Sequence, residues 1–143
     1  MSVSTLSFSL IQTDLFWEDK AANLRHLEAL LSEQQLHTDL ILLPEMFTTA
    51  FTMNVGSTGS SMEGAEVAWM QSLAKKYNCF VAGSLHIEEE GLHYNRLLVV
   101  NEEGVLAQYD KRHLFGMAGE HKVYEKGTEP LICLINNWRV NFQ

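Results

Sequence analysis

The sequence predicts an α/β layered domain, and three observations indicate this fold class. Residues 17–34 and 67–77 place apolar side chains at helical spacing. Residues 40–43 form a short, wholly apolar run between them, as expected for a strand that is covered on both sides. Strand-like runs predominate after residue 78, so the order strand, helix, strand, helix and then mostly strands fits a layered α/β architecture.

The first half of the chain supplies the predicted helices. After an apolar strand at residues 6–11, the first helix carries one apolar face, made by Ala21, Leu24, Leu27 and Leu31. The strand at residues 40–43 stops at Pro44, which cannot donate a hydrogen bond to a sheet. Residues 47–61 are rich in Thr, Ser, Gly and Asn, which predicts a loop before the second helix.

Three strand-like runs follow the second helix, at residues 79–85, 95–101 and 105–109. Tight turns are expected between them, at residues 88–91 and 102–104. This alternation of apolar runs with turn residues predicts three strands that are separated by tight turns.

The last part of the chain reads as a long connection and a strand pair. Residues 110–129 hold few aliphatic and many charged or flexible side chains, so we expect a connection there. Strands are predicted at residues 131–135 and 138–142, joined by a turn at Asn136 and Asn137. Because the chain stops within strand-like residues, without a turn or polar tail, we expect residues 1–143 to be part of a larger domain.

Composition narrows the possible partners. The 143 residues carry a net charge of -8, and the ten Lys and Arg residues are scattered. A polyanion would be repelled, so we expect no nucleic-acid or anionic membrane partner. We see no signal peptide and no apolar run of the roughly 20 residues that cross a bilayer, so we expect a cytoplasmic protein. Cys79 and Cys133 are expected to be buried thiols rather than a disulfide.

Glu45 is the first candidate for chemistry because it comes directly after the apolar strand that ends at Pro44. The carboxyl ends of strands in α/β sheets are where ligands bind. A carboxylate there loses part of its hydration, which shifts its pKa toward the range of a general base. The alternative is a surface glutamate at the start of a loop.

Lys111 is the second candidate, and it follows the strand at residues 105–109. An ammonium group at a strand end can stabilise the oxyanion that develops in acyl transfer. The alternative is a solvated charge cluster with Asp110 and Arg112. His113 could be a supporting group, a base or a metal ligand.

Neither cysteine has a basic neighbour in the sequence that would favour its thiolate, so both are weak candidates for a nucleophile. The six histidines show no H-E-x-x-H or similar ligand spacing. We therefore expect no catalytic metal and no cofactor.

Taken together, these pieces resemble the nitrilase superfamily of carbon–nitrogen hydrolases, and the correspondence runs in order along the chain. Residues 40–45 are similar to the segment that ends in the family's catalytic glutamate, and residues 94–96 (Tyr-Asn-Arg) to its Tyr-Asn pair. Residues 109–115 (Tyr-Asp-Lys-Arg-His-Leu-Phe) are similar to its lysine motif. Glu120 and Gly127 match the spacing of a second glutamate and its glycine.

The resemblance implies the N-terminal half of an α-β-β-α sandwich and a Glu-Lys-Cys triad. Glu45 would be the base, Lys111 would hold the oxyanion, and Glu120 would orient Lys111. In the family, the nucleophilic cysteine follows the strand that residues 138–143 resemble. We therefore expect it shortly after Gln143 and expect the 143-residue form to be inactive.

The closest likeness is to the omega-amidase branch, which implies a small amide substrate such as 2-oxoglutaramate and a homodimer in the complete protein. We assign substrate contacts to Phe47, Arg112 and His113. Two alternatives stay open: an inactive fragment that binds or self-associates, and a metal-dependent hydrolase that uses some of His86, His93, His113 and His121.

Overall fold

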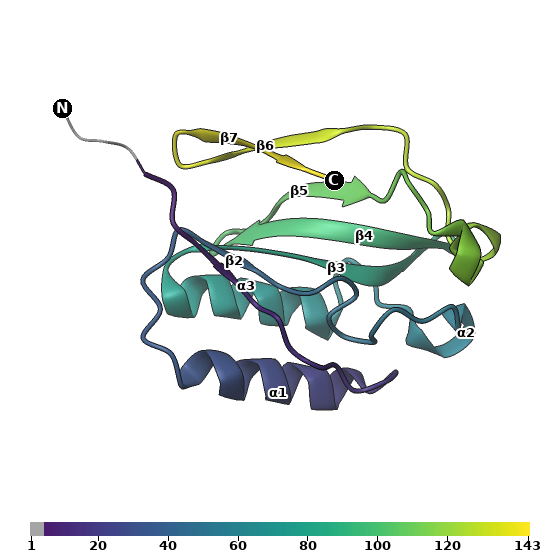
Figure 1. The fold of residues 1–143 in the computed structure, drawn as a ribbon, viewed down its shortest axis with the longest axis horizontal. Coiled ribbons are helices and arrows are strands. Elements are labelled where there is room, and N and C mark those ends of the chain that lie inside the picture. Colours follow the sequence, from purple (N-terminus) through teal and green to yellow (C-terminus); the bar gives the residue numbers. More distant parts are fainter. Residues whose placement is uncertain (1–4) are drawn as a thin grey trace.

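The computed structural model describes residues 5–143, and a single five-stranded sheet forms its centre (Figure 1). The first three strands run parallel to one another, whereas the third, fourth and fifth pair antiparallel. In spatial order the strands are β1 (Phe8–Leu10), β2 (Leu40–Leu42), β3 (Phe80–Glu89), β4 (Leu92–Asn101) and β5 (Gly104–Asp110). This sheet confirms the predicted α/β fold class.

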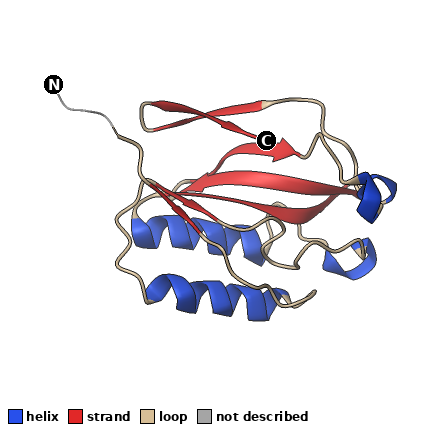
Figure 2. Cartoon of the chain, viewed as in Figure 1, coloured by secondary structure: helices blue, strands red, loops and turns tan. Residues whose placement is uncertain are grey.

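Two helices, α1 (Lys20–Ser32) and α3 (Ala65–Tyr77), cover one face of the sheet (Figure 2). The Asp19 carboxylate accepts a hydrogen bond from the Ala22 backbone N–H and caps the start of α1. Asn78 adopts the left-handed conformation, with φ of 49°, and ends α3. The apolar faces of both helices join β2, β3 and β4 in the main core, so the two predicted helices are confirmed.

A two-stranded hairpin, β6 (Leu131–Ile135) and β7 (Trp138–Phe142), packs on the opposite face of the sheet. Its inward residues Cys133, Ile135 and Phe142 form a second, smaller core with residues of β2, β3 and β4. The strand bounds and the turn at Asn136 agree with the sequence analysis.

Three segments differ from the sequence prediction. The loop at residues 47–61 contains a single helical turn, α2 (Val55–Thr58). The connection at residues 110–129 contains two 3-10 turns, η1 (Gly116–Ala118) and η2 (Glu120–Lys122). Strands β3 and β4 run to a turn at Glu90 and Gly91 and are longer than predicted, because polar residues that interrupt the apolar pattern still pair in the sheet.

The pairing of β4 with β5 contains a bulge. Val100 lies opposite Val105 and Val99 opposite Ala107, so Leu106 is an extra residue in β5. Residues that face each other in an antiparallel pair share one face of the sheet. The extra residue therefore turns Ala107 and the alternate residues after it toward the hairpin face, whereas Val105 lies on the helix face.

Within residues 5–143, the structure contains no helix that is long and apolar enough to span a lipid bilayer.

A pair of histidines, of which His86 is buried, ties β3 and β4 to α2. The His86 side chain is fully buried, with Nδ1 2.8 Å from Thr58 Oγ1 and Nε2 2.9 Å from His93 Nδ1. Because the Thr58 hydroxyl donates its hydrogen to the Asn54 carbonyl, it must accept from His86 Nδ1–H. The neutral His86 then accepts from His93. Burial, together with the charges of His93 and Lys20, lowers the pKa of His86 to about 4.

This buried histidine predicts a pH-dependent stability. An unfolded chain binds a proton at His86 near pH 6.5, but the folded protein does so only near pH 4. The free energy of unfolding should therefore fall by up to ~1.4 kcal/mol per pH unit as pH drops through this window. Urea denaturation at several pH values measures the slope. His86→Gln should reduce it, with the exposed His37→Gln as the control, and an unchanged slope in His86→Gln would contradict the assignment.

Candidate active site

Four polar side chains meet at one end of the sheet because of the directions in which its strands run. Glu45 follows the carboxyl end of β2, Lys111 directly follows β5, and Asn95 lies near the start of β4. Since β3 is parallel to β2 and antiparallel to β4, and β4 is antiparallel to β5, these positions fall at the same end of the sheet. The connection after β5 brings Glu120 to the same place, where it contacts Asn95 and Lys111. Figure 1 shows this connection in green at the right-hand end of the sheet.

Lys111 is held between two carboxylates. Its Nζ lies 2.9 Å from Glu45 Oε1 and 3.0 Å from Glu120 Oε2. Burial disfavours the charged form of Lys111, but hydrogen bonds to the two carboxylates and their negative charge outweigh this effect and raise its pKa. Lys111 therefore stays an ammonium group with a fixed position.

Glu120 is the fully buried member of the cluster. Its carboxylate accepts hydrogen bonds from Lys111 Nζ, from Asn95 Nδ2 and from the backbone N–H of Phe115. A buried carboxylate needs such partners to remain ionised. Gly119, with φ of 76°, joins the two 3-10 turns and places Glu120 at the start of the second.

The backbone around Glu45 is also fixed. Met46, the next residue, has a φ of 47°, which is uncommon for a residue with a side chain. Its N–H donates to Ser84 Oγ at 2.9 Å, and the N–H of Phe47 donates to the Ser84 carbonyl at 3.2 Å. These bonds from β3 hold the turn that presents Glu45.

A cavity of about 410 Å³ opens beside this cluster. Its walls combine the polar cluster with apolar strand residues, and its lining consists of Leu42, Leu43, Glu45, Ala82, Gly83, Ser84, Asn95, Leu97, Tyr109, Lys111, His113 and Gln143. A carboxylate, an ammonium and an amide thus face one space whose remaining wall combines apolar strand residues with a few polar side chains. This arrangement can accept a proton and stabilise an oxyanion in the same small volume.

The three residues predicted to contact substrate lie in three different places in the structure. His113 is exposed and lines the cavity. Phe47 does not line it, because its side chain is fully buried in the main core and packs 5.7 Å from the Trp69 ring. Phe47 thus packs in the main core, and its contact with substrate stays a prediction.

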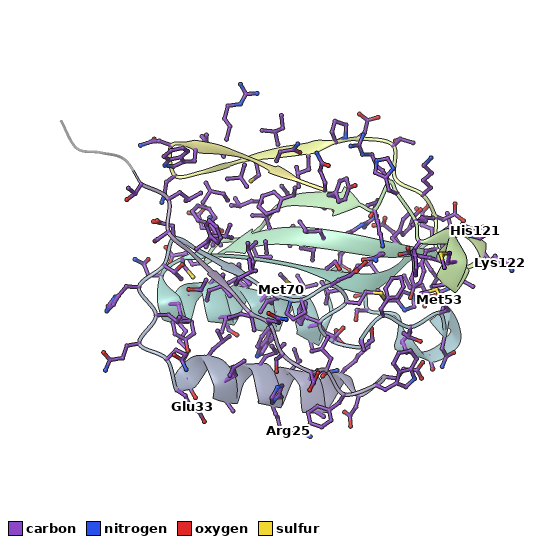
Figure 3. The ribbon with its side chains drawn as sticks, viewed as in Figure 1. Arg25, Glu33, Met53, Met70, His121 and Lys122 are labelled. Atoms are coloured by element: carbon purple, nitrogen blue, oxygen red, sulfur yellow. The ribbon has the colours of Figure 1, made fainter. Side chains whose placement is uncertain are left out.

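Arg112 lies outside the main cavity. It lines a second hollow of about 580 Å³ together with His113, His121 and Lys126. Figure 3 shows His121 and Lys122 at the end of the molecule that carries the loop after β5. Arg96, a further basic residue near the cluster, has a buried side chain that pairs with Asp110 and Glu89.

Neither cysteine lines the cavity. Cys79 and Cys133 are both buried, and the first belongs to the main core and the second to the hairpin core. Burial raises the pKa of both thiols, that of Cys79 to about 11. Both thiols are thus poor sources of a thiolate at neutral pH.

No group of three or more His, Cys, Asp or Glu side chains within residues 5–143 is arranged to hold a metal ion. Of the four histidines considered as ligands, His86 and His93 contact each other, whereas His113 and His121 line the second hollow.

Sequence reasoning gave no role in the site to Asn95 or Ser84. Asn95 was noted only as part of a motif, yet it contacts both glutamates. Ser84 holds the turn after β2. The Phe51 ring lies 5.0 Å from Lys111 Nζ and 6.4 Å from the Phe115 ring, so aromatic side chains border the ammonium. The closeness of these residues arises from strand pairing and loop packing, which no local pattern reveals.

Comparison with known sequences identifies relatives along most of the chain. The sequence model of the carbon–nitrogen hydrolases matches residues 8–135. An omega-amidase from Yersinia enterocolitica is 39% identical over 138 residues, which cover 96% of this chain and 53% of that protein. A 2-oxoglutaramate amidase from Bacillus subtilis is 27% identical over 126 residues, covering 86% and 49%. The chain spans about half the length of these curated relatives.

Solved structures also share the fold of this chain along most of its length. A carbon–nitrogen hydrolase superfamily protein from Xanthomonas campestris, with an arsenic adduct in its active site, has a TM-score of 0.90 and 37% identity over 95% of this chain and 51% of that one. An amidase from a Nesterenkonia species, which has an active-site cysteine, has a TM-score of 0.79 over 96% of this chain and 56% of that one. At 19% identity, this second likeness shows the fold alone.

The loop that carries Glu120 gives a testable prediction at Gly127. A Cβ at this position would collide with the Asp110 carbonyl, 2.7 Å from its carbon atom, so Gly127→Ala must displace the loop or β5. We expect a loss of stability of about 1–3 kcal/mol, measured by urea denaturation. The control is Gly116→Ala, whose added Cβ would meet only His121 Nδ1 at 3.8 Å. Equal stabilities of the two variants would contradict the close packing at Gly127.

Proposed function

This chain belongs to the carbon–nitrogen hydrolase family, and from that premise we propose that the protein carrying it hydrolyses a small ω-amide to a carboxylate and ammonia. The observation that supports the proposal best is the fixed position of the Lys111 ammonium between Glu45 and Glu120 at the wall of a cavity. Glu45 has the exposure that a proton acceptor needs, since half of its side chain is accessible.

We propose a cysteine nucleophile from the chain that follows β7. Gln143, the residue after β7, lines the same cavity as Glu45 and Lys111, so chain beyond it comes close to both. The positions and raised pKa values of Cys79 and Cys133 argue against either of them in this role. The resemblance of residues 138–143 to the strand before the family's cysteine supports the same placement.

In the first half of the reaction, Glu45 accepts the thiol proton and the sulfur attacks the amide carbonyl carbon. The electron pair of the C=O double bond moves to the oxygen, and the Lys111 ammonium stabilises this oxyanion. The intermediate then collapses. The C–N bond breaks, the proton passes from Glu45 to the leaving nitrogen, and ammonia departs from a thioester.

In the second half, water replaces ammonia. Glu45 accepts a proton from the water as its oxygen attacks the thioester carbon, and Lys111 again faces the oxyanion. The C–S bond breaks, and Glu45 returns the proton to sulfur. Glu120 does not exchange protons in this scheme. Its role is to hold Lys111, since it is buried and accepts a hydrogen bond from it.

The relatives suggest the substrate class. An omega-amidase and a 2-oxoglutaramate amidase match most of this chain, which favours a short amide that carries a carboxylate at its other end. His113 is positioned to contact such a substrate because it lines the cavity. Arg112 is our second choice for the carboxylate, through the neighbouring hollow that it shares with His113. Location in the cytoplasm and assembly as a homodimer are further parts of the proposal. The first rests on the sequence expectation given above, and the second rests on the family resemblance.

The role of Glu45 is tested by Glu45→Gln in the complete protein. This substitution keeps the shape of the side chain but removes the proton acceptor, so ammonia release from an ω-amide should fall at least ~100-fold. The matched control is Glu63→Gln, which changes an exposed glutamate outside the cavity. Near-normal ammonia release by Glu45→Gln would rule out Glu45 as the base. Absence of ammonia release by the unmodified protein would instead favour a binding module.

A further inference from the structure

We infer that Asn95 is a positioning residue for the proposed hydrolysis, whose side-chain amide fixes the Glu45 carboxylate so that Oε2 is the oxygen that accepts the proton. This inference rests on the proposed function. It adds to it a residue outside the predicted triad and assigns the reacting atom of the base.

Asn95 joins the two carboxylates of the site. Its Nδ2 lies 2.8 Å from Glu45 Oε1 and 3.0 Å from Glu120 Oε1, and only 2% of the residue is exposed. An amide nitrogen carries two hydrogens, so each carboxylate receives one. The opposite orientation of the amide would place its oxygen against both carboxylates and is excluded by repulsion. Asn95 is therefore a neutral donor to two anions.

The two oxygens of Glu45 consequently differ. Oε1 accepts from both Asn95 Nδ2 and Lys111 Nζ. No hydrogen bond from a side chain or backbone group of residues 5–143 reaches Oε2. Glu45 is half exposed and lines the cavity, so its second oxygen is the one left to exchange protons. An oxygen that already accepts two hydrogen bonds is the poorer proton acceptor.

A rigid part of the fold sets the position of Asn95. It lies on β4, opposite His86 of β3, and its carbonyl accepts the backbone N–H of Lys111 at 3.0 Å. Asn95 and Lys111 are thus neighbours on adjacent strands, and both reach the same two glutamates. Four side chains form a closed ring in which each carboxylate binds one amide hydrogen and one ammonium hydrogen.

The charge of this ring explains why a neutral donor matters. Two carboxylates face one ammonium, so the ring has an excess of one negative charge. The other titratable side chains at the cavity wall are His113 and Tyr109. Without the amide hydrogens of Asn95, the negative form of Glu45 loses a hydrogen bond and its protonation becomes easier. In the reaction, Oε2 takes the thiol proton as the S–C bond forms and passes it to nitrogen as the C–N bond breaks.

The test compares Asn95→Ala with the unmodified complete enzyme. Losing one hydrogen bond to a charged group predicts a kcat that is ~10- to 100-fold lower, with KM largely unchanged. As the pH is lowered, kcat/KM falls where the base becomes protonated, and we call this part of the pH profile the acidic limb. Because the amide stabilises the carboxylate form of Glu45, its removal should move this acidic limb to higher pH.

Asn95→Asp serves as a second variant of almost the same shape. It removes the donor and adds a third carboxylate, so the acidic limb should move further in the same direction than in Asn95→Ala. If Asn95→Ala does not fold, Asn95→Asp decides the question. The matched control is Asn101→Ala on the same strand. Asn101 accepts hydrogen bonds from Glu103 and Gly104 in the turn after β4, so its loss should lower stability and leave the pH profile in place.

The outcomes separate this inference from the proposed function. An acidic limb at its original pH in both Asn95 variants would overturn the role of Asn95, even where Glu45→Gln abolishes ammonia release. Near-normal ammonia release by Glu45→Gln would overturn the proposed function itself. A low kcat with a shifted limb in the Asn95 variants, and with an unshifted limb in Asn101→Ala, supports the inference.

Discussion

The charged contact between Lys111 and its two carboxylates is the constraint on which the rest of the site depends. It joins Glu45 to a residue 66 positions later in the chain, and it gives the fully buried Glu120 carboxylate a charged hydrogen-bond donor. A buried charge that loses its partner destabilises a protein strongly. The ring therefore holds the structure together as well as forming the proposed catalytic centre, because the loop that carries Glu120 cannot move without separating that carboxylate from its partners.

The direction of each strand explains how such distant residues meet. The sheet changes from parallel to antiparallel pairing at β3. As a result, the carboxyl ends of β2 and β5 lie at the same end of the sheet. The helices shield one face of the sheet, and the β6–β7 hairpin covers part of the other. The polar cluster lies at the cavity beside the sheet, and Ser84 of β3 and Asn95 of β4 hold its side chains and backbone in place.

Part of this site could be predicted from local sequence patterns, namely the residues whose immediate neighbours in the sequence indicate a role. Glu45 and Lys111 stand directly after apolar strands, and strand ends are where ligand sites form. Glu120 has no such context and was found only through a family resemblance. Phe47 was predicted to contact substrate because its loop follows Glu45, whereas in the structure its side chain is buried in the main core. Asn95 gave no sign of its contacts, since they depend on the pairing of β4 with its neighbours.

The bulge at Leu106 has a consequence for how this fold can change its length. A strand that alternated strictly from Val105 would present Lys111 to the helices, so the extra residue is what aims the ammonium at the cavity. Deletions of single residues at different positions of β5 therefore have different effects on the face that Lys111 occupies. Removing Leu106 restores regular alternation and leaves the later pairs in place, whereas removing Gln108 would turn Lys111 to the opposite face. Within the residues of β5 that follow Val105, a single-residue deletion keeps Lys111 on its present face only at the bulge.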